Sequence, residues 1–341
     1  MKLSLGMNLR YGPWGGGNQI GQSLTDYLRH KGVEVYFDLK QSDLDIILLT
    51  DPRNQSLSAT YKHKEILKYV LKKNWRTIVV HRVNECDERK GTTGVNKILR
   101  IANLCADHTI FVSAWLKDLH LDQGFKCEHY SIIHNGSDRS IFHTKGYQRW
   151  DKESPMRLIT HHWGGNWMKG FDIYERLDSL LQKEPFKDTI SFTYIGNLPE
   201  GFRFQNATYI KPTHGVQLAS LIRQHHVYLT ASRNEPGPNH QNEGANCGLP
   251  LLYRESGSLP EYCSGFGISF TEDNFEEKLS EMMLTYRYWM DRMKDYPHTA
   301  ERMCENYYNL FLELMERRET ILTRRRWWRK PFWLLKNIIK M

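Results

Sequence analysis

Residues 231–250, ASRNEPGPNHQNEGANCGLP, decide how the chain is expected to fold. An apolar run at 227–231 precedes this stretch, and another at 251–253 follows it. Pro238 suits the first position of a helix, so a helix is predicted at 239–247. A strand, a helix and a second strand in this order form the unit from which parallel α/β sheets are built.

Two carboxylates, Glu235 and Glu243, lie on either side of this predicted strand-to-helix junction. Glu235 follows the strand, at the edge of a parallel sheet where α/β proteins bind their ligands. Glu243 lies in the new helix, whose first-turn amides can face an anion. Two carboxylates with this spacing can contact two parts of one elongated ligand.

The same alternation of apolar runs and helical stretches extends along the whole chain, which predicts a parallel α/β architecture. Strands are expected at 2–9, 33–39, 45–50, 77–82, 108–113, 130–134, 156–162, 190–195, 207–210, 227–231, 251–253 and 267–270. Helices are expected at 18–31, 61–73, 93–104, 114–123, 171–182, 216–224, 239–247, 274–296 and 299–322.

The length of 341 residues favours two domains, at roughly 150 residues per domain. The polar stretch 137–155 has no clear periodicity and is the predicted linker. We therefore expect a Rossmann-like domain over 1–145 and a second over 146–300. A helix at 301–323 is expected to cross back to the first domain, and residues 324–341 form a basic, aromatic tail.

Composition excludes several classes of protein. The hydrophobic fraction of 40% is that of a globular chain rather than a disordered one. No apolar run reaches the roughly 18–20 residues of a membrane-spanning helix. The start, MKLSLGMNLRYG, turns polar too early for a signal peptide. The six cysteines include no C-x-x-C pair, so a reduced, cytoplasmic protein is expected.

Glycines 15–17 follow the first predicted strand and precede a helix. Such a loop presents bare backbone amides at a helix N-terminus, where phosphate binds, although a tight turn between strand and helix explains it equally well. The chain has neither G-x-G-x-x-G nor G-x-x-x-x-G-K-[ST], which weakens the interpretation as a nicotinamide-binding or P-loop protein.

The E-x7-E spacing, with Cys-Gly-Leu-Pro at 247–250, resembles the retaining glycosyltransferases of family 4, which have the GT-B fold of two facing Rossmann-like domains with a cleft between them. Further segments that resemble this family are FVSAWL at 111–116, IIHNGSD at 132–138 with Phe142, WGGNWMKGFD at 163–172, and Gly257 with Pro260 and Glu261.

The resemblance implies roles for particular residues. Glu235 would hold hydroxyls of the donor sugar, Glu243 the ribose hydroxyls, and Lys169 the diphosphate. The family's usual arginine, five residues before that lysine, is Gly164 here, and His162 or Asn166 can take its place. The remaining members of the implied donor site are Gly16, Gly17, Gly237 and Asn239.

The cluster HRVNECDERK at 81–90 follows another predicted strand. The resemblance assigns His81 a catalytic position facing the donor sugar. Arg82, Asn84 and Asp87 are candidates for contacts with acceptor or sugar hydroxyls, although a charged run is more often a solvated face.

The resulting hypothesis is a retaining glycosyltransferase that moves a sugar from a nucleotide-diphosphate donor to a saccharide or lipid-linked hydroxyl, in surface polysaccharide or glycolipid assembly. No cofactor and no metal are expected, because Lys169 and helix amides would stabilise the leaving diphosphate. The D-x-D sequence at 43–45 is expected to open a core strand rather than to bind metal. The alternatives are a sugar-nucleotide epimerase on the same fold and an inactive, membrane-attached glycan-binding protein.

The net charge of +8 lies almost entirely in the tail at 324–341, which has seven basic residues and no acid. Without them, 40 basic residues face 39 acidic ones. Basic residues interleaved with Trp, Phe, Leu and Ile favour attachment to the inner face of an anionic membrane. Binding of RNA and docking on the protein's own surface are the competing interpretations; we expect no nucleic-acid partner.

Overall fold

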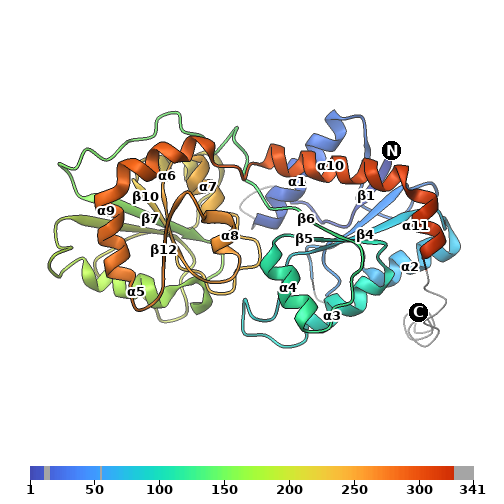
Figure 1. Ribbon diagram of the computed structural model, residues 1–341, viewed down its shortest axis with the longest axis horizontal. Helices are drawn as coiled ribbons and strands as arrows, with labels where there is room; N and C mark the ends of the chain where they lie inside the picture. The colour runs from blue at the N-terminus through green and yellow to red at the C-terminus, as the bar shows by residue number, and fades with distance from the viewer. Residues whose placement is uncertain (11–15, 54–55, 326–341) are drawn as a thin grey trace.

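The computed structural model describes residues 1–10, 16–53 and 56–325. Within them the chain forms two α/β domains that lie next to each other (Figure 1), each around a six-stranded sheet. The strand orders are β2-β1-β3-β4-β5-β6 and β12-β11-β10-β7-β8-β9, with all strands parallel. The prediction of two Rossmann-like domains is confirmed.

The elements of the N-terminal domain are β1 (Lys2–Leu5), α1 (Gly16–His30), β2 (Glu34–Tyr36), β3 (Ile46–Leu49), α2 (His63–Lys72), β4 (Ile78–Val83), α3 (Val95–Ala102), β5 (His108–Phe111), α4 (Ala114–Asp122) and β6 (Tyr130–Ile132). Those of the C-terminal domain are β7 (Met156–His162), α5 (Phe171–Leu180), β8 (Ile190–Gly196), β9 (Thr208–Ile210), α6 (Gly215–Arg223), β10 (Val227–Thr230), α7 (His240–Asn246), β11 (Leu251–Arg254), α8 (Leu259–Cys263), β12 (Gly267–Phe270) and α9 (Phe275–Arg292). Two helices follow, α10 (Ala300–Glu316) and α11 (Arg318–Arg324).

The central strands are buried on both faces, as helices cover both sides of a parallel sheet. Every residue of β4 is buried, including two polar ones, His81 and Arg82. Because all the strands of a sheet are parallel, their carboxyl ends lie at one edge of that sheet: the loops after β1, β3 and β4 in the first sheet, and those after β7 and β10 in the second.

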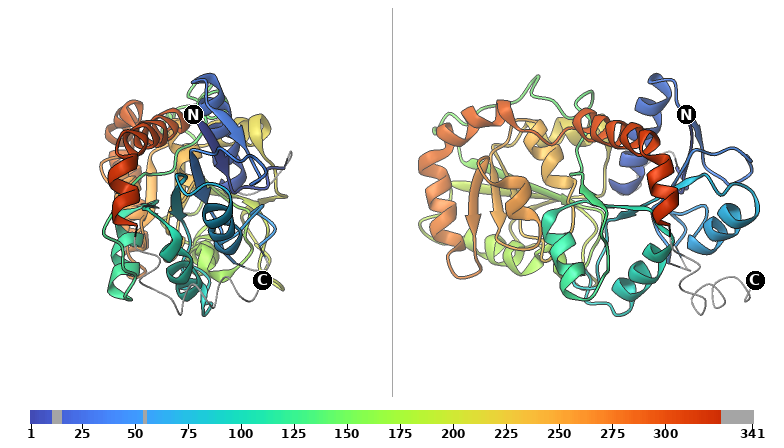
Figure 2. Two further views of the ribbon diagram at one scale, coloured as in Figure 1. Left: turned by 90° about the vertical axis from the view of Figure 1, so that its right-hand side faces the viewer. Right: turned by 45° about the vertical axis from the view of Figure 1, so that its right-hand side comes forward.

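The helix predicted over 299–322 is two helices, with a break at Arg317 (φ −92°, ψ 12°). Helix α10 returns to the N-terminal domain and packs against α1 (Figures 1 and 2). Its buried face, which includes Tyr307, Phe311 and Leu314, belongs to the same hydrophobic core as β1 and β3. The N-terminal domain is therefore completed by the end of the chain.

The stretch predicted as a linker, 137–155, contains no helix or strand, but it is packed rather than free. Phe142 and Trp150 are buried in the cores of the C-terminal domain. At its start, Ser137 pairs with Thr299, so the two chain crossings between the domains are hydrogen-bonded side by side. A Cβ atom on Gly136 would lie 2.2 Å from the Thr299 backbone, and this close approach requires a glycine.

All six cysteines are free thiols. Among the described helices, none has the length and apolar character needed to cross a membrane.

Candidate active site

Glu235 lies in the loop after β10, at the edge where the two domains meet. The loop is fixed by Ser258, whose backbone amide and hydroxyl both donate to the Glu235 carbonyl oxygen. Gly257 (φ +61°) approaches the Glu235 backbone so closely that a Cβ there would lie 2.5 Å from its amide nitrogen. The glutamate side chain is 5% exposed.

Two cations hold the Glu235 carboxylate. Lys169 Nζ lies 2.6 Å from one oxygen, and Arg89 Nε of the N-terminal domain lies 3.1 Å from the other. Burial alone would raise the pKa of Glu235, but the charges of Arg89 and Lys169 outweigh it and lower the pKa to about 2. Glu235 is therefore ionised at neutral pH and joins the two domains.

Lys169 reaches this carboxylate from a short 3-10 turn after β7. Gly170 follows with φ +97°, and a Cβ on it would lie 2.5 Å from Ala231. A glycine is required here because the turn packs directly against the end of β10. Burial lowers the pKa of Lys169, and the positive charge of Arg89 adds to this effect.

Glu243 in α7 is buried and has a different partner. Its carboxylate lies 2.7 Å from His161 Nε2 at the end of β7. The other ring nitrogen of His161 is 2.8 Å from the Tyr228 hydroxyl, which fixes the ring between the two elements. The two glutamates of the E-x7-E spacing are thus both anchored in the C-terminal domain, one by cations and one by a histidine.

The N-terminal domain contributes a cleft of about 420 Å³ at the same edge. Gly16, Gly17, Arg82, Asn84 and Arg89 line it. A Cβ on Gly16 would lie 2.1 Å from Asn239 Nδ2, so the start of α1 abuts the C-terminal domain at α7. Gly15 of the predicted loop lies outside the described residues.

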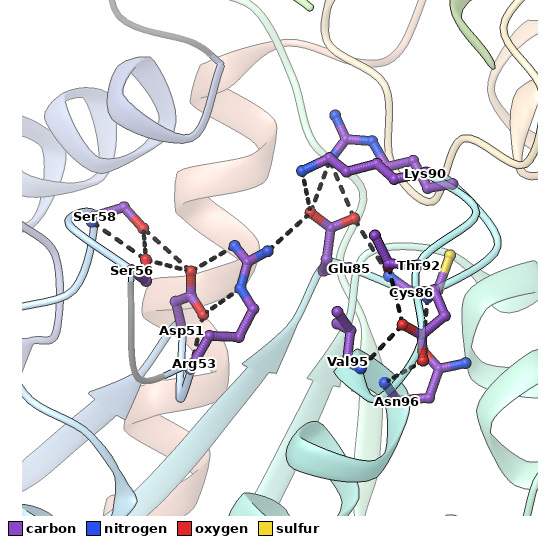
Figure 3. A network of polar contacts seen from close by, with 12 residues as sticks. Asp51, Arg53, Ser56, Ser58, Glu85, Cys86, Lys90, Thr92, Val95 and Asn96 are labelled. Carbon is purple, nitrogen blue, oxygen red and sulfur yellow. Dashed lines mark hydrogen bonds and ion pairs between the residues drawn. The ribbon is translucent and has the colours of Figure 1, made fainter. Parts of the chain in front are cut away.

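A line of alternating charges follows the floor of this cleft (Figure 3). Asp51, after β3, makes a two-point ion pair with Arg53, and Arg53 lies 3.7 Å from Glu85. Glu85 also pairs with Arg89 and with Lys90. Through Arg89 the line reaches Glu235 and the C-terminal domain.

His81 does not line this cleft. It is fully buried in β4, and its Nδ1 is 2.9 Å from Asn103 Oδ1. Burial lowers its pKa to about 4, which keeps the ring neutral. The His81 side chain therefore points into the interior of the N-terminal domain and away from the cleft, where the resemblance places a catalytic residue.

Asp87 has a structural role in place of the predicted sugar contact. Its carboxylate accepts hydrogen bonds from the backbone amides of Gly94, Val95 and Asn96, at the start of α3. It also accepts one from the Thr92 hydroxyl. An aspartate that satisfies the free amides of a helix start is a capping residue.

Arg82 and Asn84 line the cleft, and their contact with acceptor or sugar hydroxyls stays a prediction. Arg82 is 2% exposed and donates to Tyr307 and Asn135. Gly237 is packed against Val112 and Asn135 of the other domain, so its backbone forms part of the interface.

His162 and Asn166 lie close to Lys169. Burial lowers the pKa of His162 far below its usual value, and its Nε2 lies 2.7 Å from the Tyr174 hydroxyl. Because His162 is neutral and Asn166 is an amide, neither supplies the charge of the arginine that the resemblance expects at Gly164.

The D-x-D residues lie at the amino end of β3, opposite the cleft edge. Asp43 pairs with Lys2, and Asp45 accepts from the Lys2 backbone and pairs with Arg318. Among the described residues, no group of three or more His, Cys, Asp or Glu side chains is arranged to hold a metal.

Sequence reasoning did not single out Asp51, Arg53, Glu85 or Arg89. A signal for them was present, because Asp51 and Glu85 each follow a buried strand of the same parallel sheet. Strands β3 and β4 are neighbours, so their carboxyl ends bring these side chains together.

The comparisons with known proteins bear on the fold. No family model and no curated protein sequence matches the chain. Solved structures do match over most of its length. HepE from Anabaena, in complex with UDP-glucose, has a TM-score of 0.63 at 14% identity, covering 92% of this chain and 100% of that one. Sucrose-phosphate synthase from Thermosynechococcus elongatus has a TM-score of 0.62 at 12% identity, covering 92% and 99%.

WaaG, a glycosyltransferase involved in lipopolysaccharide biosynthesis, has a TM-score of 0.61 at 12% identity and covers 91% of this chain and 99% of that one. The fold is GT-B. At these identities the likeness establishes the fold alone.

Proposed function

We propose that the protein is a retaining glycosyltransferase of the family 4 type. It would move a sugar from a nucleotide-diphosphate donor to a hydroxyl group during assembly of a surface polysaccharide or glycolipid. The observation that carries the proposal is the ionised Glu235, held by Lys169 at the carboxyl end of β10. A fixed carboxylate accepts hydrogen bonds from sugar hydroxyls, and the adjacent ammonium group suits a phosphate.

The chemical problem in this reaction is the departure of a nucleoside diphosphate, whose negative charge grows as the glycosidic bond breaks. Lys169 and the amides at the start of α1, where Gly16 and Gly17 line the cleft, would stabilise that charge. Glu243 would hold the ribose hydroxyls, as the resemblance implies. We propose that no divalent metal takes part.

The first experiment measures turnover of nucleotide sugars, beginning with UDP-glucose because HepE is described in complex with it. Release of the nucleoside diphosphate and of free sugar is followed without an added acceptor. We expect slow hydrolysis of one donor. Release of an altered sugar would indicate the epimerase, and binding without turnover would indicate the glycan-binding protein.

The metal proposal is tested by the same assay after treatment with EDTA. Activity should be retained, and Asp43→Asn should behave like the wild type because Asp43 is paired with Lys2 away from the cleft. A loss that Mn²⁺ restores, and that Asp43→Asn reproduces, contradicts the proposal.

We also propose that the basic tail brings the protein to an anionic membrane carrying a lipid-linked acceptor, as a peripheral protein of the cytoplasmic face. Residues 326–341 lie outside the described residues. Arg325, in contrast, is buried in an ion pair with Asp107. Its charge serves the fold, so the membrane-binding part is expected to begin after it.

Deletion of residues 327–341 tests the membrane proposal and retains this ion pair. The intact protein should float with vesicles containing phosphatidylglycerol, less at high salt, because each basic residue near such a surface adds up to ~1 kcal/mol. The truncated protein should stay unbound and keep donor hydrolysis. If the intact protein ignores these vesicles, the tail does not bind membranes.

A further inference from the structure

The charge balance at Glu235 leaves the proposed diphosphate site short of one cation. Among the residues that the structure describes, Lys169 is the one lysine assigned to this site, and its charge is already matched by Glu235. A nucleoside diphosphate brings at least two more negative charges into a partly buried site, which is costly without positive partners. His162 and His240 are close by, but burial lowers both pKa values far below 6.5, so both are neutral.

The position of the missing family arginine has room for a side chain. A Cβ on Gly164 would lie 3.6 Å from Lys169 Cε and 3.4 Å from Asn166 Nδ2, which are ordinary contact distances. Its backbone is not in the left-handed region. A cation could therefore stand beside Lys169 at this position, but the sequence places a glycine there.

Arg89 approaches the same point from the N-terminal domain. Its Nε is buried 3.1 Å from Glu235 Oε1, and no acceptor is aligned to receive its hydrogen bond among the described residues. Its Nη1 lies 3.1–3.2 Å from the two carboxylate oxygens of Glu85, which fix the guanidinium at the cleft. Burial alone would lower the pKa of Arg89, but Glu235 and Glu85 outweigh it, so Arg89 stays charged.

The surroundings of Arg89 have an excess of positive charge. In the line from Asp51 to Lys169, three carboxylates face four cations (the acids Asp51, Glu85 and Glu235, and the bases Arg53, Arg89, Lys90 and Lys169). Arg82, which lines the same cleft, has no carboxylate partner among the described residues. A site with this balance suits an anionic ligand.

We propose that Arg89 is the second cation of the diphosphate site, so that the diphosphate is held between Lys169 of one domain and Arg89 of the other. This inference rests on the proposed function. Because the two cations belong to different domains, diphosphate binding would also favour the closed arrangement in which both reach the Glu235 region.

The test compares nucleoside diphosphates with the matching monophosphates by isothermal titration calorimetry, using UDP, GDP and ADP against UMP, GMP and AMP. Arg89→Gln should weaken diphosphate binding about ten- to hundredfold and change monophosphate binding little, because it removes one charged contact to the distal phosphate. Arg100→Gln is the matched control. It removes an exposed arginine of the same domain, which donates to the Gln123 carbonyl oxygen away from the cleft, and should change neither affinity.

A rescue experiment sharpens the test. In the Arg89→Gln background, Gly164→Arg places a guanidinium beside Lys169. The double variant should bind the diphosphate at least tenfold more tightly than Arg89→Gln alone. If Arg89→Gln does not fold, Arg89→Lys replaces it. This variant keeps the charge but loses the Nε contact, and should still bind the diphosphate severalfold more weakly than the wild type.

The outcomes separate the two proposals. If none of the diphosphates binds the wild type, the proposed function fails. If one binds and Arg89→Gln matches Arg100→Gln, the role of Arg89 is overturned while the proposed function stands. An equal loss of monophosphate and diphosphate binding also overturns it, since Arg89 would then act only on domain closure.

Discussion

The two domains hold the cleft in different ways. On the C-terminal side, Lys169, Glu235 and Glu243 each have a partner within their own domain, and their side chains are 5–11% exposed. On the N-terminal side, Arg53 and Arg89 are 33% and 26% exposed. The charged groups of the C-terminal side are thus buried against partners of their own domain, whereas the two arginines of the N-terminal side are more exposed to solvent and to a ligand.

The domains also differ in how they are completed. The main core of the C-terminal domain is formed by residues between Trp150 and Tyr286. The N-terminal core takes in residues of α10 and α11, from Met303 to Ile321. The N-terminal domain should therefore be the one whose stability depends on the end of the chain.

The largest effect is expected at the ion pair between Arg325 and Asp107, whose side chains are 0% and 3% exposed. Arg325 also donates to the carbonyl oxygens of Trp75 and Thr77. Arg325→Leu leaves the Asp107 carboxylate buried without its partner, which should lower the free energy of unfolding by about 3–5 kcal/mol. Urea unfolding measures this.

Its control is Arg317→Ala, which removes an exposed ion pair with Glu313 and should cost under about 0.5 kcal/mol. The double variant Arg325→Leu/Asp107→Leu should recover much of the loss, because a buried pair can be replaced by apolar side chains. Equal losses in Arg325→Leu and Arg317→Ala would show that the buried ion pair stabilises the protein no more than an exposed one. The N-terminal domain would then not depend on this pair at the end of the chain.

The next effect concerns turnover. Glu235→Gln should lower the rate of donor hydrolysis about 10²–10³-fold, because it removes the fixed charge at the reacting sugar. Nucleoside diphosphate affinity should be retained, since the carboxylate no longer competes for Lys169 and Arg89. Asp51→Asn changes a carboxylate on the N-terminal side of the cleft, and should reduce donor hydrolysis less than tenfold. Similar losses in both variants would contradict the division of roles.

Glu243→Gln should produce a smaller effect, and on binding rather than rate. Loss of a charged hydrogen-bond partner for the ribose costs ~1.5–3 kcal/mol, or roughly ten- to hundredfold in affinity. Because the ribose is common to both ligands, monophosphate and diphosphate binding should weaken together. A loss confined to the diphosphate would place Glu243 at the phosphates and refute the assignment.

The same contrast explains what the sequence could predict. Strands β7 and β12 coincide with the predicted runs 156–162 and 267–270, because each contains buried apolar residues and lies between segments with proline, glycine or polar residues that favour turns. Glu235 is predicted from its place after a strand of a parallel sheet, and Lys169 from the resemblance of residues 163–172 to a loop of the family.

Pairings across the chain could not be predicted in this way. Arg89 and Glu235 are far apart in sequence and in different domains, and nothing near either residue specifies the other. The resemblance to the family assigns His81 to the site, with Asp87 in the same cluster, but the direction of a side chain depends on tertiary packing. Asp87 accepts hydrogen bonds from backbone amides at the start of α3, and His81 lies within hydrogen-bond distance of Asn103.

A response to acid, the smallest effect when it is expressed per pH unit, should be shared by both domains despite their different clefts. His81 in the N-terminal domain and His225 in the C-terminal domain are both buried, and burial lowers both pKa values to about 4. In the unfolded chain each pKa returns to about 6.5, so between pH 6.5 and 4 the unfolded state binds more protons. Stability is therefore complete above pH 6.5 and falls as the pH drops towards 4, by up to ~1.4 kcal/mol per pH unit for each histidine.

The structure gives the reason why the folded protein resists protonation at both sites. Nε2 of His81 is buried with no hydrogen-bond partner among the described residues, and both ring nitrogens of His225 are already engaged, by the Leu221 carbonyl oxygen and the Thr193 hydroxyl. Urea unfolding between pH 7 and 4.5 tests this, with His81→Gln and His225→Gln each expected to reduce the pH slope by up to one proton. A slope that neither variant reduces would assign the acid response to other groups and remove this likeness between the domains.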